Sequence, residues 1–490
     1  MNPLKKLAGQ TVIYGLSSII PRFLNYLLVP FYTRIFVPSQ YGVITELYAY
    51  VTFFIIILTY GMETGFFRFS EMDYDNEKVY STSLISLLST SVIFILAIFL
   101  FTQPIAESIG YGQHPVYIKW LGSILALDAV SAIPFARLRS ENRAVTFSVI
   151  KIINVIINIS ANFFFLLICP YFIKHGYSAF EKVYNPELGV GYVLISNLIA
   201  SGATLLILLP RVFRFRFVFD TELWKKMIIY SFPLLIAGLA GTINESLDRV
   251  VLKHLVPDAT NAMRQLGLYG ANVKVAVLMT LFIQMFRFAA EPFFFNHSKD
   301  HDSKALFAQT TKYFTIFGLL IFLGVMLYMD LVKYFIGAEY RSALGIVPVL
   351  LMANFFLGIF YNLSIWYKLT NRTIYGAYIT LVGAGITILF NFIFVPHFGY
   401  YAAAYAHLVC YVVMVFISYL VGQKYYPVKY DISSFLFYFT VAIVIFALSR
   451  IISIQNLLLQ LGINSLLFIS FIFIIFKKEN LKISDLNLKR

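Results

Sequence analysis

Long apolar runs alternate with short polar segments along this chain, and the lengths of these runs predict its architecture. A helix of about 20 apolar residues spans the hydrocarbon core of a bilayer. Helices are favoured over a β-barrel because barrel strands are shorter and alternate in polarity. We expect about 14 spans, at residues 9–36, 40–65, 79–102, 116–137, 144–169, 189–210, 227–255, 268–295, 307–329, 345–367, 374–395, 400–422, 433–452 and 457–476.

The composition and the charge distribution support this prediction. Hydrophobic residues make up 60% of the 490 and charged residues only 13%, which exceeds what a soluble chain can bury. The net charge of +14 comes largely from loops on one side of the predicted bundle. Such a bias predicts a cytoplasmic side that holds both termini, and it explains the charge without a nucleic-acid partner.

A weak internal repeat divides the chain into two halves. Val37-Pro38 ends the first span and Tyr41-Gly42 opens the second, while Val256-Pro257 and Tyr269-Gly270 take the equivalent places later. We therefore predict an all-α integral membrane protein with two six-helix lobes and two added helices. The expected parts are an N-terminal lobe at 1–215, a C-terminal lobe at 216–430, and two C-terminal helices with a basic tail at 431–490.

The segment 231–292 carries charge where an apolar chain tolerates it least. A charge near the bilayer centre costs about 2.5 to 3.5 kcal/mol on insertion scales, so it should face protein or water. The concentration of so many charges in one hairpin favours a substrate pathway over ion pairs that only join helices. Because Lys274 and Arg287 lie on different faces of one helix, the helix must bend or the two have separate roles. The polar residues are Asn244, Glu245, Asp248, Arg249, Lys274, Gln284, Arg287 and Glu291.

Most other intramembrane charges lie in the first two spans, which hold Arg22, Arg34, Glu46 and Glu63. Outside these spans, Asp128 and Lys151 occupy equal depths of a predicted antiparallel hairpin. We interpret these two residues as a structural ion pair away from the substrate pathway.

Two short motifs resemble a known family. The run from Leu266 to Ala276, preceded by Asp248-Arg249, and the stretch from Tyr32 to Gly42 are similar to the polysaccharide branch of the multidrug/oligosaccharidyl-lipid/polysaccharide exporter superfamily. This resemblance implies a Wzx-like flippase that moves undecaprenyl-diphosphate-linked oligosaccharides from the inner to the outer leaflet by alternating access. In that superfamily, spans one, two, seven and eight line a central cavity, and these four hold most of the intramembrane charge here.

The resemblance also assigns roles to side chains. Guanidinium and ammonium groups suit a diphosphate, and amides and aromatic rings suit sugars. The expected substrate-binding set is Arg22, Asn25, Tyr26, Asn244, Arg249, Lys274, Gln284 and Arg287. The carboxylates expected to tether these bases, or to couple transport to H⁺ or Na⁺, are Glu46, Glu245, Asp248 and Glu291.

The remaining expectations concern activity, location and partners. No catalytic arrangement, metal site or cofactor motif is evident, so an enzyme is not indicated. We expect a multi-pass monomer in the bacterial inner membrane, with both termini cytoplasmic, that acts on lipid-linked oligosaccharide for O-antigen or capsule export beside other assembly proteins. The alternatives are a cation-coupled multidrug exporter of the same fold and a membrane polysaccharide polymerase or ligase. The sequence leaves open the glycan and the coupling ion.

Overall fold

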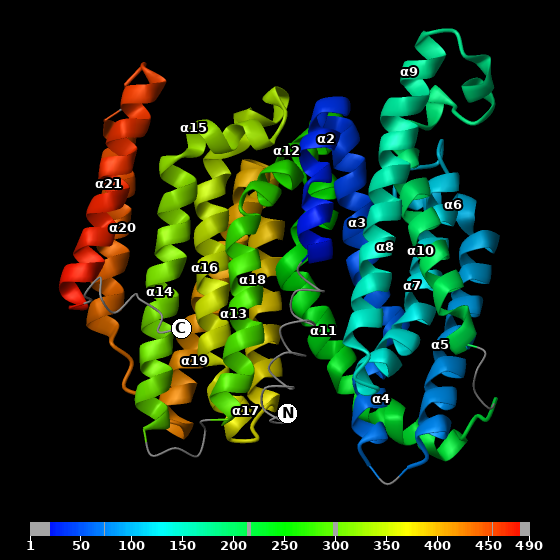
Figure 1. Cartoon of the computed structure of the whole chain (residues 1–490), viewed down its shortest axis with the longest axis horizontal. Coiled ribbons are helices and arrows are strands. Elements are labelled where there is room, and N and C mark those ends of the chain that lie inside the picture. The colour runs from blue at the N-terminus through cyan, green and yellow to red at the C-terminus, as the bar shows by residue number, and fades with distance from the viewer. Residues whose placement is uncertain (1–19, 73, 213–216, 297–301, 453, 481–490) are drawn as a thin grey trace. The chain divides into compact units, whose positions relative to one another are not determined.

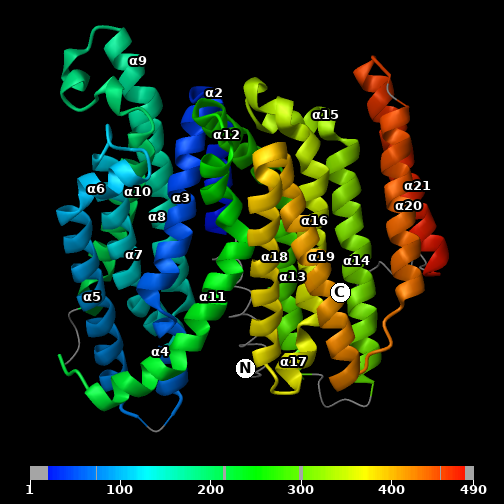
Figure 2. The same cartoon turned by 180° about the vertical axis from the view of Figure 1, so that it is seen from behind.

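The chain folds into helices joined by short connections (Figures 1 and 2). The computed structural model describes residues 20–72, 74–212, 217–296, 302–452 and 454–480, and within these ranges every regular element is helical. Twelve of the described helices are long and apolar enough to cross a membrane, or 13 if one bent pair counts as a single span. The predicted all-α membrane fold is therefore confirmed. Of the first expected span, 9–36, only residues from 20 onward are described, and residues 20–26 are helical.

The packing of the chain separates two compact units, residues 1–270 and 271–490. The expected lobe boundaries at 215 and 430 follow the repeat in the sequence rather than packing, and they stay a prediction. The helices of the first unit are α2 (Leu28–Ile35), α3 (Pro38–Thr59), α4 (Met62–Ser70), α5 (Asn76–Leu100), α6 (Thr102–Ser108), α7 (Val116–Ser140), α8 (Ala144–Phe163), the π-helical η1 (Phe164–Ile168), α9 (Cys169–Lys174), the 3₁₀ turns η2 (Ser178–Lys182) and η3 (Pro186–Leu188), α10 (Gly191–Val212), α11 (Thr221–Leu255) and the first part of α12 (Ala259–Val275).

In the first unit, α7 packs against α5 and α10, α10 packs against α8, and α3 packs against α11. The second span is broken where α3 meets α4, since Tyr60 and Gly61 both have left-handed backbone conformations (φ 33° and 71°). The Ser231 hydroxyl on α11 donates a hydrogen bond to the Gly61 carbonyl at 3.3 Å. Helix α4 begins directly after this break and carries Glu63 in its first turn. By contrast, α11 runs unbroken through Pro233.

The second unit contains α13 (Val277–Asn296), α14 (Ser303–Leu327), α15 (Met329–Val332), the 3₁₀ turns η4 (Lys333–Phe335) and η5 (Ala338–Ile346), α16 (Val347–Leu363), α17 (Ile365–Leu369), α18 (Ile374–Phe398), α19 (Tyr400–Tyr425), α20 (Ile432–Ile451) and α21 (Leu457–Lys478). Helix α19 packs against α16 and α18. The added helices α20 and α21 pack on each other and on α14, and they form one edge of this unit in Figure 1.

The eighth expected span is bent. Residues 261–275 and 277–290 form two helices at 48° to each other. Of the two outcomes expected for Lys274 and Arg287, a bend between them is the one observed. The bend lies at Ala276, two residues after Lys274.

Candidate functional site

A polar cavity of about 610 Å³ lies inside the first unit. Helical residues 20–26 and helices α3, α4, α7, α8 and α10 all contribute to its wall. Its volume is in the range of ligand-binding pockets. The charged and amide side chains of the lining are Arg22, Asn25, Glu63, Asp128, Arg139, Lys151, Asn154 and Asn197.

Three cations and two carboxylates face this cavity. Arg139 forms an ion pair with Glu63, and its guanidinium also lies 5.0 Å from the centre of the Phe67 ring. Arg139 is eleven residues after Asp128 on α7, so the pair lies about 16 Å along the helix from Asp128. Both side chains of the pair are part-exposed, at 34% and 39%, which indicates that they border the mouth of the cavity.

Deeper in the cavity, Lys151 interacts with charged side chains from several helices. Its ammonium group lies 4.1 Å from the centre of the Phe135 ring, and it interacts electrostatically with Asp128, Arg139 and Arg22. Opposite charges stabilise each other there, while three cations repel one another. The formal charges of these five side chains therefore sum to one positive charge, which an anionic ligand would neutralise.

Asp128 and Lys151, the expected structural ion pair, interact electrostatically in the first unit. Both residues line the cavity that Arg22 also lines, rather than a separate helix contact. In the described part of the chain, no salt bridge within 4 Å joins them, although Asp128 interacts with Lys151 and with Ser201. Equal depth on neighbouring helices was the basis of the prediction, and the structural role of the pair stays a prediction.

Amide side chains hold the cavity wall together. The Asn154 amide donates to the Thr204 hydroxyl at 2.9 Å, and the Asn197 amide donates to the Tyr48 hydroxyl at 2.8 Å. The Asn158 amide donates to the Asn25 carbonyl oxygen at 3.3 Å. Each of these amides has further hydrogen-bonding capacity, so the wall can bind the hydroxyl groups of a ligand.

A second group of predicted residues lies where α11 faces the helix that contains Tyr26. Tyr26 interacts electrostatically with Arg22, Arg249 and Glu245, and Arg249 interacts with Asp248, Glu245 and Tyr26. Asn244 and Asp248 are buried, whereas Glu245 is exposed. The structure thus brings Arg22 and Arg249 within electrostatic reach of one tyrosine in the first unit.

Glu46 belongs to a third polar group and is completely buried. Its carboxylate forms a salt bridge with Lys253 at 3.0 Å and accepts a hydrogen bond from Tyr111 at 2.5 Å. Burial and the neighbouring Glu46 carboxylate raise the pKa of Tyr111 far above its usual range, so this hydroxyl remains a donor. Lys253 also donates to the Ile109 carbonyl at 2.5 Å. These contacts join the Glu46 carboxylate on α3 to Lys253 on α11 and to Tyr111.

The other predicted residues belong to the second unit. Lys274 and Gln284 are half-buried and lie on opposite sides of the bend. Arg287 stacks over the Tyr361 ring at 4.0 Å and borders a small crevice that Lys368 also lines. The side chain of Glu291 lies outside the described residues.

Sequence reasoning did not select Arg139, Asn154 or Asn197 as site residues. A signal for two of them was present, because polar residues recur with helical spacing on two otherwise apolar spans. One stripe is Lys151, Asn154, Asn158 and Asn162 on α8, and the other is Asn197, Ser201 and Thr204 on α10. No group of three or more His, Cys, Asp or Glu side chains that could hold a metal occurs among the residues that the structure describes.

The family model for polysaccharide biosynthesis protein matches residues 7–298, more than half of the chain. The chain belongs to this family. The two motifs that suggested the resemblance both lie inside the matched region, so the predicted relationship of this polysaccharide biosynthesis protein is confirmed. A comparison with curated proteins found no match.

Solved structures show which fold this polysaccharide biosynthesis protein shares. A structure described as lipid II flippase MurJ in an inward closed conformation has a TM-score of 0.71 and 14% identity, and the match covers 96% of this chain and 100% of that chain. An inward-facing multidrug resistance MATE family transporter of the MOP superfamily has a TM-score of 0.65 and 14% identity, with 84% and 94% covered. An outward-facing transporter of that family has a TM-score of 0.57 and 13% identity, with 85% and 95% covered. The fold is thus that of MOP-superfamily transporters.

Proposed function

We propose that this polysaccharide biosynthesis protein is a flippase for undecaprenyl-diphosphate-linked oligosaccharide repeat units. It moves them by alternating access from the inner to the outer leaflet for surface polysaccharide assembly, such as O-antigen or capsule. The observation that carries the proposal is the cavity of the first unit, where Arg22, Arg139 and Lys151 face Glu63 and Asp128. The family description supports the polysaccharide context.

The chemistry of the cavity fits such a cargo. A diphosphate binds best to guanidinium and ammonium groups, and the cavity has a surplus of them. Sugar hydroxyls need donors and acceptors, which Asn25, Asn154 and Asn197 provide. We extend the binding set to Tyr26, Asn244, Arg249, Lys274, Gln284 and Arg287, and we assign Glu245, Asp248 and Glu291 to tethering or to coupling with H⁺ or Na⁺.

The proposal includes a location and a set of partners. The protein is a multi-pass monomer of the bacterial inner membrane with both termini in the cytoplasm, because basic residues concentrate on that side. It is a transporter rather than an enzyme, it needs no cofactor, and it works beside other polysaccharide assembly proteins. A multidrug exporter is the weaker alternative, since a cavity with surplus positive charge repels cationic drugs.

Substitutions at Arg22 test the proposal. Arg22→Ala should strongly reduce surface polysaccharide while the protein still reaches the membrane, and Arg22→Lys should keep more function because the charge remains. Arg22→Glu should be the worst of the three, since it repels phosphates. Arg143→Ala is the matched control, because Arg143 is 57% exposed in the turn between α7 and α8 and does not line the cavity.

The readout is surface polysaccharide per cell at equal amounts of membrane-inserted protein. Normal export by Arg22→Glu at wild-type protein levels would overturn an anion-binding role for this cavity. A loss of drug resistance across the same variants would favour the exporter.

A further inference from the structure

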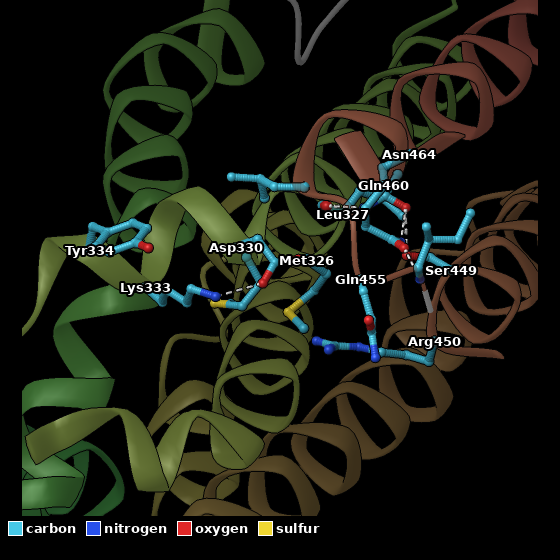
Figure 3. A pocket seen from close by; sticks show the side chains of 13 residues that line it. Met326, Leu327, Asp330, Lys333, Tyr334, Ser449, Arg450, Gln455, Gln460 and Asn464 are labelled. Atoms are coloured by element: carbon cyan, nitrogen blue, oxygen red, sulfur yellow. Dashed lines mark hydrogen bonds and ion pairs between the residues drawn. The ribbon is translucent and has the colours of Figure 1, made fainter. Parts of the chain in front are cut away.

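A second polar pocket, of about 380 Å³, lies in the second unit where the added helices meet α14 and α15 (Figure 3). Its deepest side chains are buried amides and a hydroxyl. The Asn464 amide donates to the Leu327 carbonyl at 2.6 Å, and its carbonyl oxygen accepts from Ser449 at 2.9 Å and from Gln460 at 3.3 Å. These bonds join α20 and α21 to α14 and keep the floor of the pocket polar.

The walls of the pocket carry the charges. On one side, Lys333 forms a salt bridge with Asp330 at 2.8 Å, and both side chains are part-exposed. On the other side, Arg450 extends from α20 toward Met326, close to Gln455, as Figure 3 shows. Within the described residues, no carboxylate lies within 4 Å of the Arg450 guanidinium, whose nearest aromatic ring is Phe446 at 5.4 Å. Two cations and one carboxylate thus give the pocket one surplus positive charge.

The surroundings of the pocket are strongly apolar. Ile451 is 78% exposed at the end of α20, and Leu458 is 79% exposed at the start of α21. Side chains of this kind contact lipid in a membrane protein. A ligand held by Arg450 would therefore have apolar surface directly beside its charged group.

We propose that this pocket binds the phosphate headgroup of a membrane lipid at the end of the bundle that the charge distribution predicts to face outward. Arg450 and Lys333 bind the phosphate oxygens, because guanidinium forks and ammonium groups form charge-assisted hydrogen bonds with them. Gln455 and the amide floor bind the polar part of the headgroup. Ile451, Leu458 and their neighbours contact the chains.

Two sources supply this chemistry, a glycerophospholipid and a polyprenyl phosphate. The pocket lies in the second unit and uses none of the residues assigned to transport. Its assignment therefore stands or falls independently of the flippase proposal. A bound lipid here would bridge α20 and α21 to α14. Lipid binding would then be a function of these two added helices, which lie outside the two predicted six-helix lobes.

The test is a binding titration with the purified full-length protein in a neutral detergent. The probes are dihexanoyl phosphatidylglycerol, farnesyl phosphate, dihexanoyl phosphatidylcholine and inorganic phosphate. Arg450→Gln should raise the dissociation constant of the anionic lipids about tenfold, equivalent to about 1.4 kcal/mol. Asp330→Asn should lower it by a few-fold, because a half-exposed like charge is removed from the phosphate.

Arg372→Gln is the matched control. Arg372 also stacks over an aromatic ring, that of Tyr425 at 3.9 Å, but it lies in the turn between α17 and α18, away from the pocket. This variant should bind all probes as the wild type does. Gln455→Ala adds an exposed substitution that leaves the hydrogen-bonded floor intact, and it should weaken binding in the same direction as Arg450→Gln.

The preference between the two anionic lipids identifies the source of the headgroup, and either preference supports the site. Equal binding of inorganic phosphate and the anionic lipids would overturn the lipid assignment. Unchanged binding in Arg450→Gln, or weaker binding in Asp330→Asn, would overturn the site itself.

Discussion

The buried pair of Glu46 and Lys253 offers a sharp test of how the first unit is held together. Glu46 is fully buried on α3, and Lys253 on α11 is its salt-bridge partner at 3.0 Å. Lys253→Met leaves the carboxylate buried and without its cation, which costs about 3 to 5 kcal/mol for pairs of this kind. Glu46→Gln should cost less, about 1 to 3 kcal/mol, because Lys253 is 16% exposed and can reach water. The double variant Glu46→Gln/Lys253→Met should recover part of the stability lost in Lys253→Met.

The assay is thermal unfolding of the purified variants in one detergent, followed by the loss of the monodisperse peak in size-exclusion chromatography. Lys333→Met is the matched control. The side chains of Lys333 and Asp330 are 31% and 44% exposed, so their salt bridge should contribute only about 0 to 1 kcal/mol to the free energy of unfolding. The reasoning is refuted if Lys253→Met melts at the same temperature as Lys333→Met. It is also refuted if the losses of the two single variants simply add in the double variant, because the two residues would then not interact.

Three further predictions concern topology, packing and the cavity. Reporter fusions after Asn142 and Lys478 should be cytoplasmic and one after Tyr340 external, and an external signal at Lys478 would contradict the predicted orientation. Gly267→Ala should sharply reduce the folded yield, because a Cβ there collides with the Pro38 carbonyl. Gly202→Ala is the control, since its Cβ meets nothing within 4 Å, and equal yields of the two variants would contradict the close approach of α3 and α12. Asp128→Asn should impair export at normal folded yield, because Asp128 lines the cavity rather than forming a direct salt bridge with Lys151. A lower yield of Asp128→Asn that is restored when Lys151→Met is added would instead favour a structural pair.

Much of the fold could be predicted because bilayer thickness sets the length of each span, and run length is directly readable from the sequence. The bend near Lys274 was also accessible from the sequence. Lys274 and Arg287 lie on different faces of a straight helix, so both could face one cavity only if the helix bends. The break at Tyr60-Gly61 was less accessible, because it depends on packing against Ser231 of a distant helix.

The site was predicted less completely than the fold. The binding residues were predicted in the four central spans because these hold most of the intramembrane charge. The cavity of the first unit is also lined by polar residues of α8 and α10, few of which are charged. Arg139 lies in the basic last turn of α7, and it both pairs with Glu63 and lines the cavity. In the sequence, Arg450 is the one charged residue of the span 433–452. The role of such residues depends on contacts with residues that are far away in the sequence.

The most direct test of the central claim is the distribution of lipid-linked repeat units between leaflets in cells that lack this protein. The account predicts that undecaprenyl-diphosphate-linked oligosaccharides accumulate on the cytoplasmic side and that wild-type protein, but not Arg22→Glu, restores them to the outer side. Repeat units that reach the outer side normally, with only the length of the surface polymer reduced, would contradict the flippase and favour a polymerase or ligase.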